Sequence, residues 1–119
     1  MNKKIKQKAL LPSLREKKRY LVFEVMSEGS FSYKELKDAI VSCFKELFGI
    51  DGLAKAGLEF VVYEDNKGII RVTTKGLDNL KASFCFVRKI NKYDVFLRSL
   101  GVSGILKKAK SKFMFGGVA

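Results

Sequence analysis

The sequence predicts a single α+β domain in which an antiparallel sheet packs against two helices. Its 119 residues suit one domain and leave no room for a second. A hydrophobic content of 47%, with ten phenylalanines, is enough to fill a core. Short apolar runs of period two alternate with longer runs of helical period, which is the pattern of mixed strands and helices.

The first two elements are a strand and a helix. Residues 19–27 are rich in β-branched and aromatic side chains and end at a Glu-Gly-Ser turn signal at 28–30. Ser32 and Glu35 form a capping box that predicts a helix start, and Gly49 predicts its end. Between these positions one helical face carries the apolar residues Leu36, Ala39, Ile40, Cys43, Phe44, Leu47 and Phe48.

The remaining elements complete the order βαββαβ. Three further strands are predicted at residues 58–64, 67–73 and 93–97. A Gly- and Ala-containing connection at 51–57 precedes them, and a hairpin turn at 65–68 joins the first two. A second helix is expected to start at Thr74 as N-cap and to end near Lys89. This is the ferredoxin-like or RRM-like arrangement, for which we expect the strand order 4-1-3-2.

Alternation along the strands divides their side chains between two faces. The face expected under the helices carries Leu21, Phe23, Val25, Leu58, Phe60, Val62, Ile70, Val72, Val95 and Leu97. The outer face is a mixture too apolar to lie bare in solvent. We expect it to be covered by the chain's own ends or by a partner protein, and its candidate interface residues are Tyr20, Val22, Val61, Tyr63 and Phe96.

The domain organisation predicted for residues 1–119 is one RRM-like unit with basic ends. It divides into a flexible basic tail at 1–9, a basic segment at 10–18, the core at 19–98 and a basic helix at 99–113. Ser103 is the expected cap of that last helix. Its apolar stripe, expected to dock on the core, consists of Ile105, Leu106, Ala109 and Phe113.

The net charge of +12 is concentrated in the two ends of the chain. Residues 1–19 carry a net charge of +7 and residues 98–119 carry +5, whereas residues 20–97 are neutral. Charged ends can simply keep a protein soluble. A field this dense also attracts polyanions, because each neutralised phosphate releases counterions. The sequence therefore predicts a nucleic acid as the leading partner, ahead of an anionic membrane surface.

Composition excludes several kinds of chemistry. The chain has no histidine, which removes the commonest general base and the commonest zinc ligand. Its two cysteines, Cys43 and Cys85, lie far apart in apolar stretches and are expected to be reduced core residues of a cytoplasmic protein. We expect no metal site, no membrane-spanning segment and no small-molecule ligand.

Paired carboxylates are the remaining route to catalysis. Glu24 and Asp94 could approach each other across the sheet and hold Mg²⁺. Arg71 and Arg98, however, lie on the strands that flank Glu24, and cross-strand ion pairing accounts for it better. We therefore expect no catalytic residue.

The sequence favours one mode of nucleic-acid binding over another. RRM domains stack bases on aromatic residues of the third strand, but here Ile69 and Arg71 stand at those positions after Lys67-Gly68. We therefore expect phosphate contacts, together with either phosphate-binding amides or a simple turn at residues 100–104. The candidate RNA-binding residues are Arg15, Lys17, Lys18, Arg19, Arg98, Ser103, Gly104, Lys107, Lys108, Lys110 and Lys112.

Three motifs resemble a known family. They are LPSLREKKRY at residues 11–20, GIIR at 68–71 and, most specifically, RSLGVSGILKK at 98–108. Together they resemble the archaeal ribonuclease P protein component 2 family, the counterpart of a subunit of eukaryotic ribonuclease P and MRP. The resemblance runs from about Leu11 to Phe113.

The resemblance implies a role in tRNA maturation. Members of that family have an RRM-like fold with extra helices and contact the catalytic domain of the RNA that removes the 5′ leader from precursor tRNA. The RNA performs the chemistry, so we expect no cofactor on the protein and Mg²⁺ on the RNA. The family also implies pairing with component 3 and a homodimer at the centre of a heterotetramer.

Two other functions remain open at this stage. A ribosomal or other structured-RNA-binding protein could have the same fold and the same basic ends, because charge does not distinguish one RNA from another. A small-molecule regulatory module on a ferredoxin-like scaffold is also conceivable, although the terminal basic segments count against it.

Overall fold

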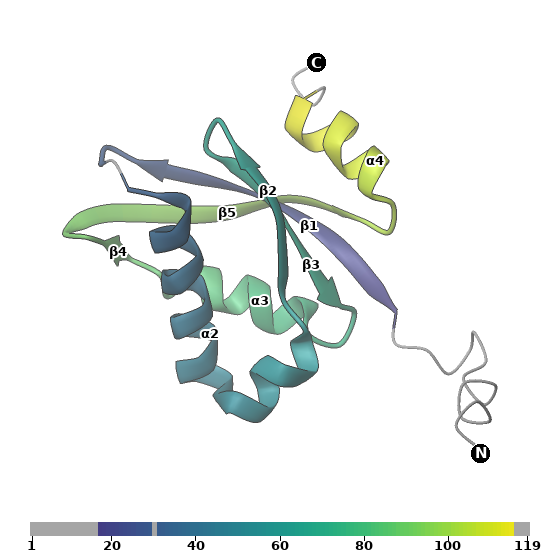
Figure 1. The fold of residues 1–119 in the computed structure, drawn as a ribbon, viewed down its shortest axis with the longest axis horizontal. Helices are drawn as coiled ribbons and strands as arrows, with labels where there is room; N and C mark the ends of the chain where they lie inside the picture. The colour runs from purple at the N-terminus through teal and green to yellow at the C-terminus, as the bar shows by residue number, and fades with distance from the viewer. Residues whose placement is uncertain (1–16, 30, 116–119) are drawn as a thin grey trace.

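The protein is an α+β unit built on a curved antiparallel sheet (Figure 1). A computed structural model describes residues 17–29 and 31–115. The sheet contains β1 (Lys18–Ser27), β2 (Glu59–Glu64), β3 (Lys67–Thr73), β4 (Lys89–Ile90) and β5 (Tyr93–Ser103). The helices are α2 (Tyr33–Ala56), α3 (Leu77–Phe84), α4 (Leu106–Ala109) and its π-helical continuation η2 (Lys110–Phe115).

The strands follow the order β2-β3-β1-β5-β4. The four long strands therefore have the predicted neighbours, with all pairings antiparallel. The structure adds the two-residue strand β4, which the sequence did not predict and which pairs with Asp94 and Tyr93. It also extends β5 to Ser103, so residues 99–103 belong to the sheet and not to the C-terminal helix as predicted.

Helix α2 begins where the sequence predicted. The hydroxyl oxygen of Ser32 accepts a hydrogen bond from the Glu35 backbone, and the Glu35 carboxylate accepts one from the Ser32 backbone. The predicted end at Gly49 is a kink instead, because this glycine adopts a left-handed φ of 77° and the helix resumes beyond it. The expected connection at residues 51–57 is consequently helical as far as Ala56.

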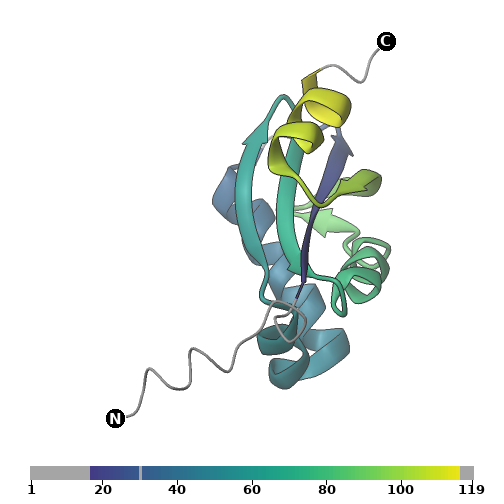
Figure 2. The same ribbon diagram turned by 90° about the vertical axis from the view of Figure 1, so that its right-hand side faces the viewer.

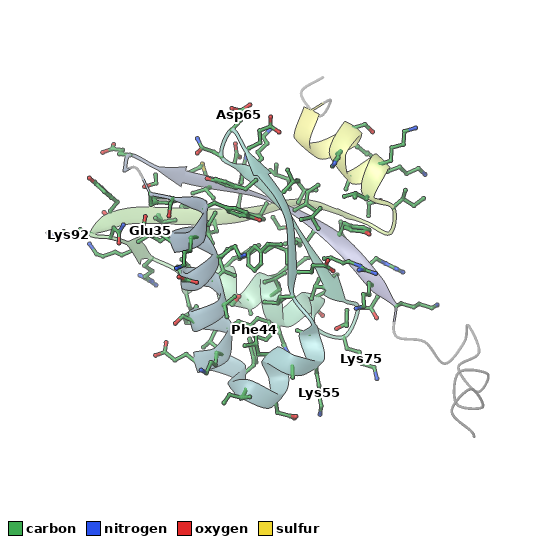
Figure 3. All side chains as sticks on the ribbon, viewed as in Figure 1. Glu35, Phe44, Lys55, Asp65, Lys75 and Lys92 are labelled. Carbon is green, nitrogen blue, oxygen red and sulfur yellow. The ribbon has the colours of Figure 1, made fainter. Side chains whose placement is uncertain are left out.

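The core lies between the sheet and the two helices α2 and α3. Figure 3 shows Phe44 reaching from α2 into this space, and its side chain is fully buried. Strand β1 contributes Leu21, Phe23 and Val25, as the alternation predicted. Their burial against α2 and α3 removes apolar surface from water, which is the main term that stabilises this fold.

The connection from β3 to α3 differs from the prediction by one residue. Thr73, and not Thr74, supplies the turn hydroxyl, which accepts from the Gly76 backbone N–H at 3.1 Å. The same hydroxyl donates to the Lys55 carbonyl of α2 at 3.2 Å. Helix α3 then begins after Gly76 and ends at Phe84, before the predicted end near Lys89.

Two tight turns close the hairpins at one end of the sheet. Asp65 and Asn66 both have positive φ, as a two-residue hairpin loop requires. Asn91 and Lys92 do the same between β4 and β5. The Asn91 amide donates to the Glu35 carboxylate at 2.5 Å, which ties this turn to the start of α2. Figure 3 shows Glu35 and Lys92 at this same end of the molecule.

A β-bulge in β2 turns the side chains at the end of this strand to the faces opposite to those predicted. Phe60 pairs with Ile70 and Val62 pairs with Ile69, so Val61 is the extra residue. Because one added residue changes the parity of a strand, Tyr63 lies on the helix side and stacks on Tyr33 with ring centroids 5.3 Å apart. Val62, predicted for the core under the helices, packs on the outer face instead.

Candidate nucleic-acid interface

The C-terminal helix covers part of the outer face of the sheet. Ala109 is fully buried and packs with Val22 of β1 and Ile69 of β3. Leu106 and Leu100 pack around this small cluster. Figure 2 shows the helix in front of the strands, on the side away from α2. The expectation that the last helix docks on the core is therefore confirmed for Leu106 and Ala109.

For two other residues of the predicted apolar stripe, packing on the sheet is not confirmed. Ile105 is 54% exposed and does not pack on the sheet. The reason is its position: it lies in extended backbone at the cap of α4, before the helix begins. The side chain of Phe113 lies outside the part of the chain that the structure describes.

Pairing of β1 with β5 brings the two basic ends of the chain together. Tyr20 of β1 pairs directly with Ser103 of β5, immediately before α4. A Cβ atom placed on Gly104 would lie 3.6 Å from a guanidinium nitrogen of Arg19. The start of β1 and the turn into α4 thus form one continuous surface, although more than 80 residues separate them in sequence.

This surface carries most of the predicted RNA-binding residues. Lys17, Lys107, Lys108 and Lys112 are exposed, and Lys18, Arg19 and Lys110 are half-buried. We call these seven residues the basic surface. Arg15 lies outside the described residues.

Ser103 and Gly104 form the turn before α4. The Ser103 hydroxyl accepts from the Ile105 backbone N–H at 3.1 Å and donates to the Ile105 carbonyl at 3.2 Å. Ile105, and not Ser103, is therefore the residue at the N-cap position of α4. Since Ser103 uses the Ile105 amide and α4 has only four residues, the turn reading of residues 100–104 fits better than the phosphate-binding one.

Arg98 is placed differently from the other candidates. Its Nε and Nη2 atoms lie 3.0 and 2.9 Å from the same carboxylate oxygen of Glu24. This confirms cross-strand ion pairing of Glu24, whereas Arg71 pairs with Glu59 at 3.0 Å. An RNA phosphate would have to compete with Glu24 for Arg98, so Arg98 is the weakest of the basic candidates.

The predicted protein-interface residues divide into three groups. Tyr20, Val22 and Val61 belong to the cluster under the C-terminal helix, so the chain itself covers them. Tyr63 faces the helices because of the bulge described above. Phe96 remains on the outer face with 59% of its surface exposed.

Sequence reasoning missed a group of exposed apolar residues around the start of β5. Met26 is the cross-strand partner of Phe96, and Phe86 and Tyr93 are exposed nearby in the fold. Alternation along β1 could have identified Met26, because it follows Val22 and Glu24 on the same face. Phe86 follows α3, where no periodic pattern applies.

Three phenol and thiol groups of the described residues are partly buried. Burial raises the pKa of the Tyr33 and Tyr63 hydroxyls and of the Cys43 thiol, with Glu46 adding to the effect on Cys43. Residues 17–29 and 31–115 contain no cluster of carboxylates and thiols that could hold a metal ion. Within the same ranges no helix is long and apolar enough to cross a membrane.

Comparisons with known proteins give a consistent result. A family model described as Rpp14/Pop5 family matches residues 19–114. Ribonuclease P protein component 2 of Thermococcus gammatolerans is 38% identical over 92% of this chain and 92% of its own length. That of Methanocaldococcus jannaschii is 36% identical over 90% of this chain and 80% of its own length.

One solved structure has a similar fold. A chain in the cryo-EM structure of yeast ribonuclease MRP matches with a TM-score of 0.63. The match covers 76% of each chain at 14% sequence identity, so it establishes likeness of fold only.

Proposed function

Because the chain belongs to the Rpp14/Pop5 family, we propose that it is a protein subunit of ribonuclease P, which removes the 5′ leader from precursor tRNA. In this role the protein binds and stabilises the catalytic RNA, and the RNA carries the chemistry. The observation that supports RNA binding most directly is the basic surface, in which two distant segments converge through the pairing of Tyr20 with Ser103 and the docking of Ala109 on the sheet.

The mode of binding follows from the fold, which we classify as a variant of the ferredoxin-like or RRM-like arrangement. On the outer face, Val22 and Ile69 lie beneath the C-terminal helix, so that part of the sheet is closed to stacking bases. Lysine and arginine groups remain for contact, and these read phosphates more than base identity. The basic surface therefore neutralises RNA backbones that approach one another, while Mg²⁺ is held by the RNA itself.

The partners that we propose are those of the family. They are the catalytic domain of ribonuclease P RNA and protein component 3, with a homodimer of this chain at the centre of a heterotetramer. We place the assembly in the cytoplasm. A ribosomal or other structured RNA is the alternative target, and the experiment below distinguishes it.

The proposal is tested by salt-dependent binding to ribonuclease P RNA. Lys107 and Lys108 are both exposed on the C-terminal helix, so Lys107→Ala/Lys108→Ala removes two charges without disturbing the packing of Ala109. The slope of log affinity against log salt should fall by about two, since each phosphate contact contributes roughly one. The matched control, Lys34→Ala/Lys45→Ala, removes the same charge from exposed positions of α2.

Reconstitution of precursor tRNA cleavage provides the functional readout. The wild-type chain should increase cleavage by the RNA with its other subunits, and the Lys107/Lys108 variant should require more protein for the same effect. Equal slopes for the variant and the α2 control would remove the C-terminal helix from the binding surface. No gain in cleavage from the wild-type chain, with tight binding to another structured RNA, would favour the alternative.

A further inference from the structure

Strand β5 leaves most of one edge without a strand partner. It has eleven residues, but β4 pairs only with Tyr93 and Asp94 at its start. One more bond follows, from the Val95 N–H to the Arg88 carbonyl at 2.9 Å. Beyond Val95, no strand among residues 17–29 and 31–115 lies on this side of β5. Figure 1 shows β4 beside only the beginning of β5.

The N–H and C=O groups of some β5 residues point toward β1, and those of the others point to the open edge. Successive residues of a strand point their N–H and C=O groups to opposite sides, so Leu97 and Ser99 point to the same side as Val95. The pairing of β1 agrees with this direction. The N–H of Val25, the partner of Leu97, bonds to Asn66 on the far side of β1. Leu97 and Ser99 therefore present backbone donors and acceptors away from β1.

A groove with apolar and charged walls lies at the start of this edge. It has a volume of about 470 Å³ and is lined by Phe84, Val87, Arg88, Val95 and Phe96 among others. Phe96 is 59% exposed at its rim, and Phe86 is 58% exposed on a neighbouring depression that shares Val87 and Arg88. Large exposed aromatic groups of this kind are enriched at protein interfaces.

The charge at the rim distinguishes between possible occupants. Lys89 is paired with Asp94 at 3.1 Å, whereas Arg88 is exposed and has no ion pair within the described residues. An occupant with an acidic side chain is therefore favoured. Residues 1–16 of this chain carry five basic residues and one acidic residue, so they do not complement the charge of Arg88.

We propose that the open edge of β5 is the docking site for an extended segment of a partner protein, which adds to the sheet as a further strand. An apolar side chain of that segment enters the groove between Phe84 and Phe96, and an acidic side chain pairs with Arg88. The main-chain bonds to Leu97 and Ser99 supply affinity, and the groove supplies specificity. This inference rests on the proposed function, because it takes protein component 3 as the partner that contributes the segment.

The site is independent of RNA binding in this arrangement. The basic surface lies at the start of β1 and on the C-terminal helix, while the docking edge lies along β5 as far as Ser99. A subunit built this way can bind RNA and a protein at the same time.

Calorimetric titration of the full-length chain with component 3 from the same organism tests the proposal. Phe96→Ser removes the aromatic rim, and Ser99→Pro removes one N–H on the open edge, where proline is tolerated. Each should weaken binding by about tenfold or more. Arg88→Glu should weaken it further in low salt. The control Ile50→Ser changes an apolar side chain that is 71% exposed at the kink of α2 and should leave the affinity unchanged.

The possible outcomes separate this inference from the proposed function. Wild-type affinity in Phe96→Ser, Ser99→Pro and Arg88→Glu would overturn the docking edge while leaving the salt-dependent RNA binding intact. Loss of self-association in these variants, without loss of component 3 binding, would assign the edge to a second copy and equally overturn it. Failure of the wild-type chain to bind component 3 would reject both the partner and the docking edge.

Discussion

Replacement of Thr73 by valine should destabilise the fold by removing two hydrogen bonds of a buried side chain. Thr73 is only 2% exposed, and its hydroxyl joins the end of α2 to the turn before α3. Lys55 is next to last in α2, so its carbonyl is one of those left without a partner inside the helix. Thr73→Val keeps the shape of the side chain and removes the group that satisfies this carbonyl.

The size of the effect follows from which partners are left. The Gly76 N–H retains a second bond, to the Thr73 carbonyl at 3.0 Å, so its loss is small. The Lys55 carbonyl, whose hydrogen bond is only partly buried, loses its hydroxyl donor. The cost lies between the net value of one hydrogen bond, about 0.5–1.5 kcal/mol, and that of an unsatisfied buried polar group, about 1–3 kcal/mol. We expect a decrease of about 1–2 kcal/mol in the free energy of unfolding, which moves the urea midpoint down by about 0.5–1 M.

Urea unfolding followed by circular dichroism provides the measurement. The matched control is Thr74→Val, because Thr74 is exposed and was the residue that the sequence favoured as the cap. Its midpoint should change by an amount equivalent to less than about 0.5 kcal/mol. An unchanged midpoint for Thr73→Val, or an equal decrease in both variants, would refute the reasoning.

Three further predictions concern other parts of the fold. Gly68→Ala should destabilise by about 1–3 kcal/mol in urea unfolding, since its methyl group would lie 2.6 Å from a ring carbon of the buried phenylalanine at the centre of β1. Hydrogen bonds from the Asn91 amide and the Ser32 backbone lower the pKa of the Glu35 carboxyl group. The ionised carboxylate therefore stabilises the fold above its ordinary pKa. This stabilisation is lost as the pH falls through the lowered pKa. Glu35→Gln should accordingly flatten the pH dependence of the urea midpoint below about pH 5, and parallel curves for both proteins would contradict this. Cys85, predicted as a core residue, is instead exposed at the C-cap of α3. Iodoacetamide should therefore modify Cys85 faster than Cys43, whose burial raises its thiol pKa, and mass spectrometry of the labelled peptides would detect the opposite order.

Periodicity predicted the fold where the pattern was long and regular. The helix that starts at Ser32 and the core residues of β1 follow directly from spacing. The two-residue strand β4 was missed because so short a segment has no period to detect. The sequence predicted a helix end at Gly49, because a glycine after an apolar run gives the same local signal at a kink and at a helix end.

The candidate site was predicted from charge but not from geometry. Clustering of basic residues at the two ends identified the basic surface, and pairing of Tyr20 with Ser103 then placed those ends side by side. The bulge at Val61 reversed the side of Tyr63, and no local signal in an apolar strand reveals an extra residue. The sequence predicted that Glu24 forms an ion pair with a neighbouring arginine. It did not predict that this ion pair would compete with RNA for Arg98.

The small contact beneath the C-terminal helix also affects the dynamics of the protein. Alanine and leucine side chains hold this helix to the sheet, so it can open at a lower free energy than the strands beneath it and exchange its amide hydrogens sooner. An RNA that binds only the docked arrangement stabilises it by mass action. Hydrogen exchange in the last helix would then slow as RNA is added, and the segment would become ordered most fully in the assembled particle.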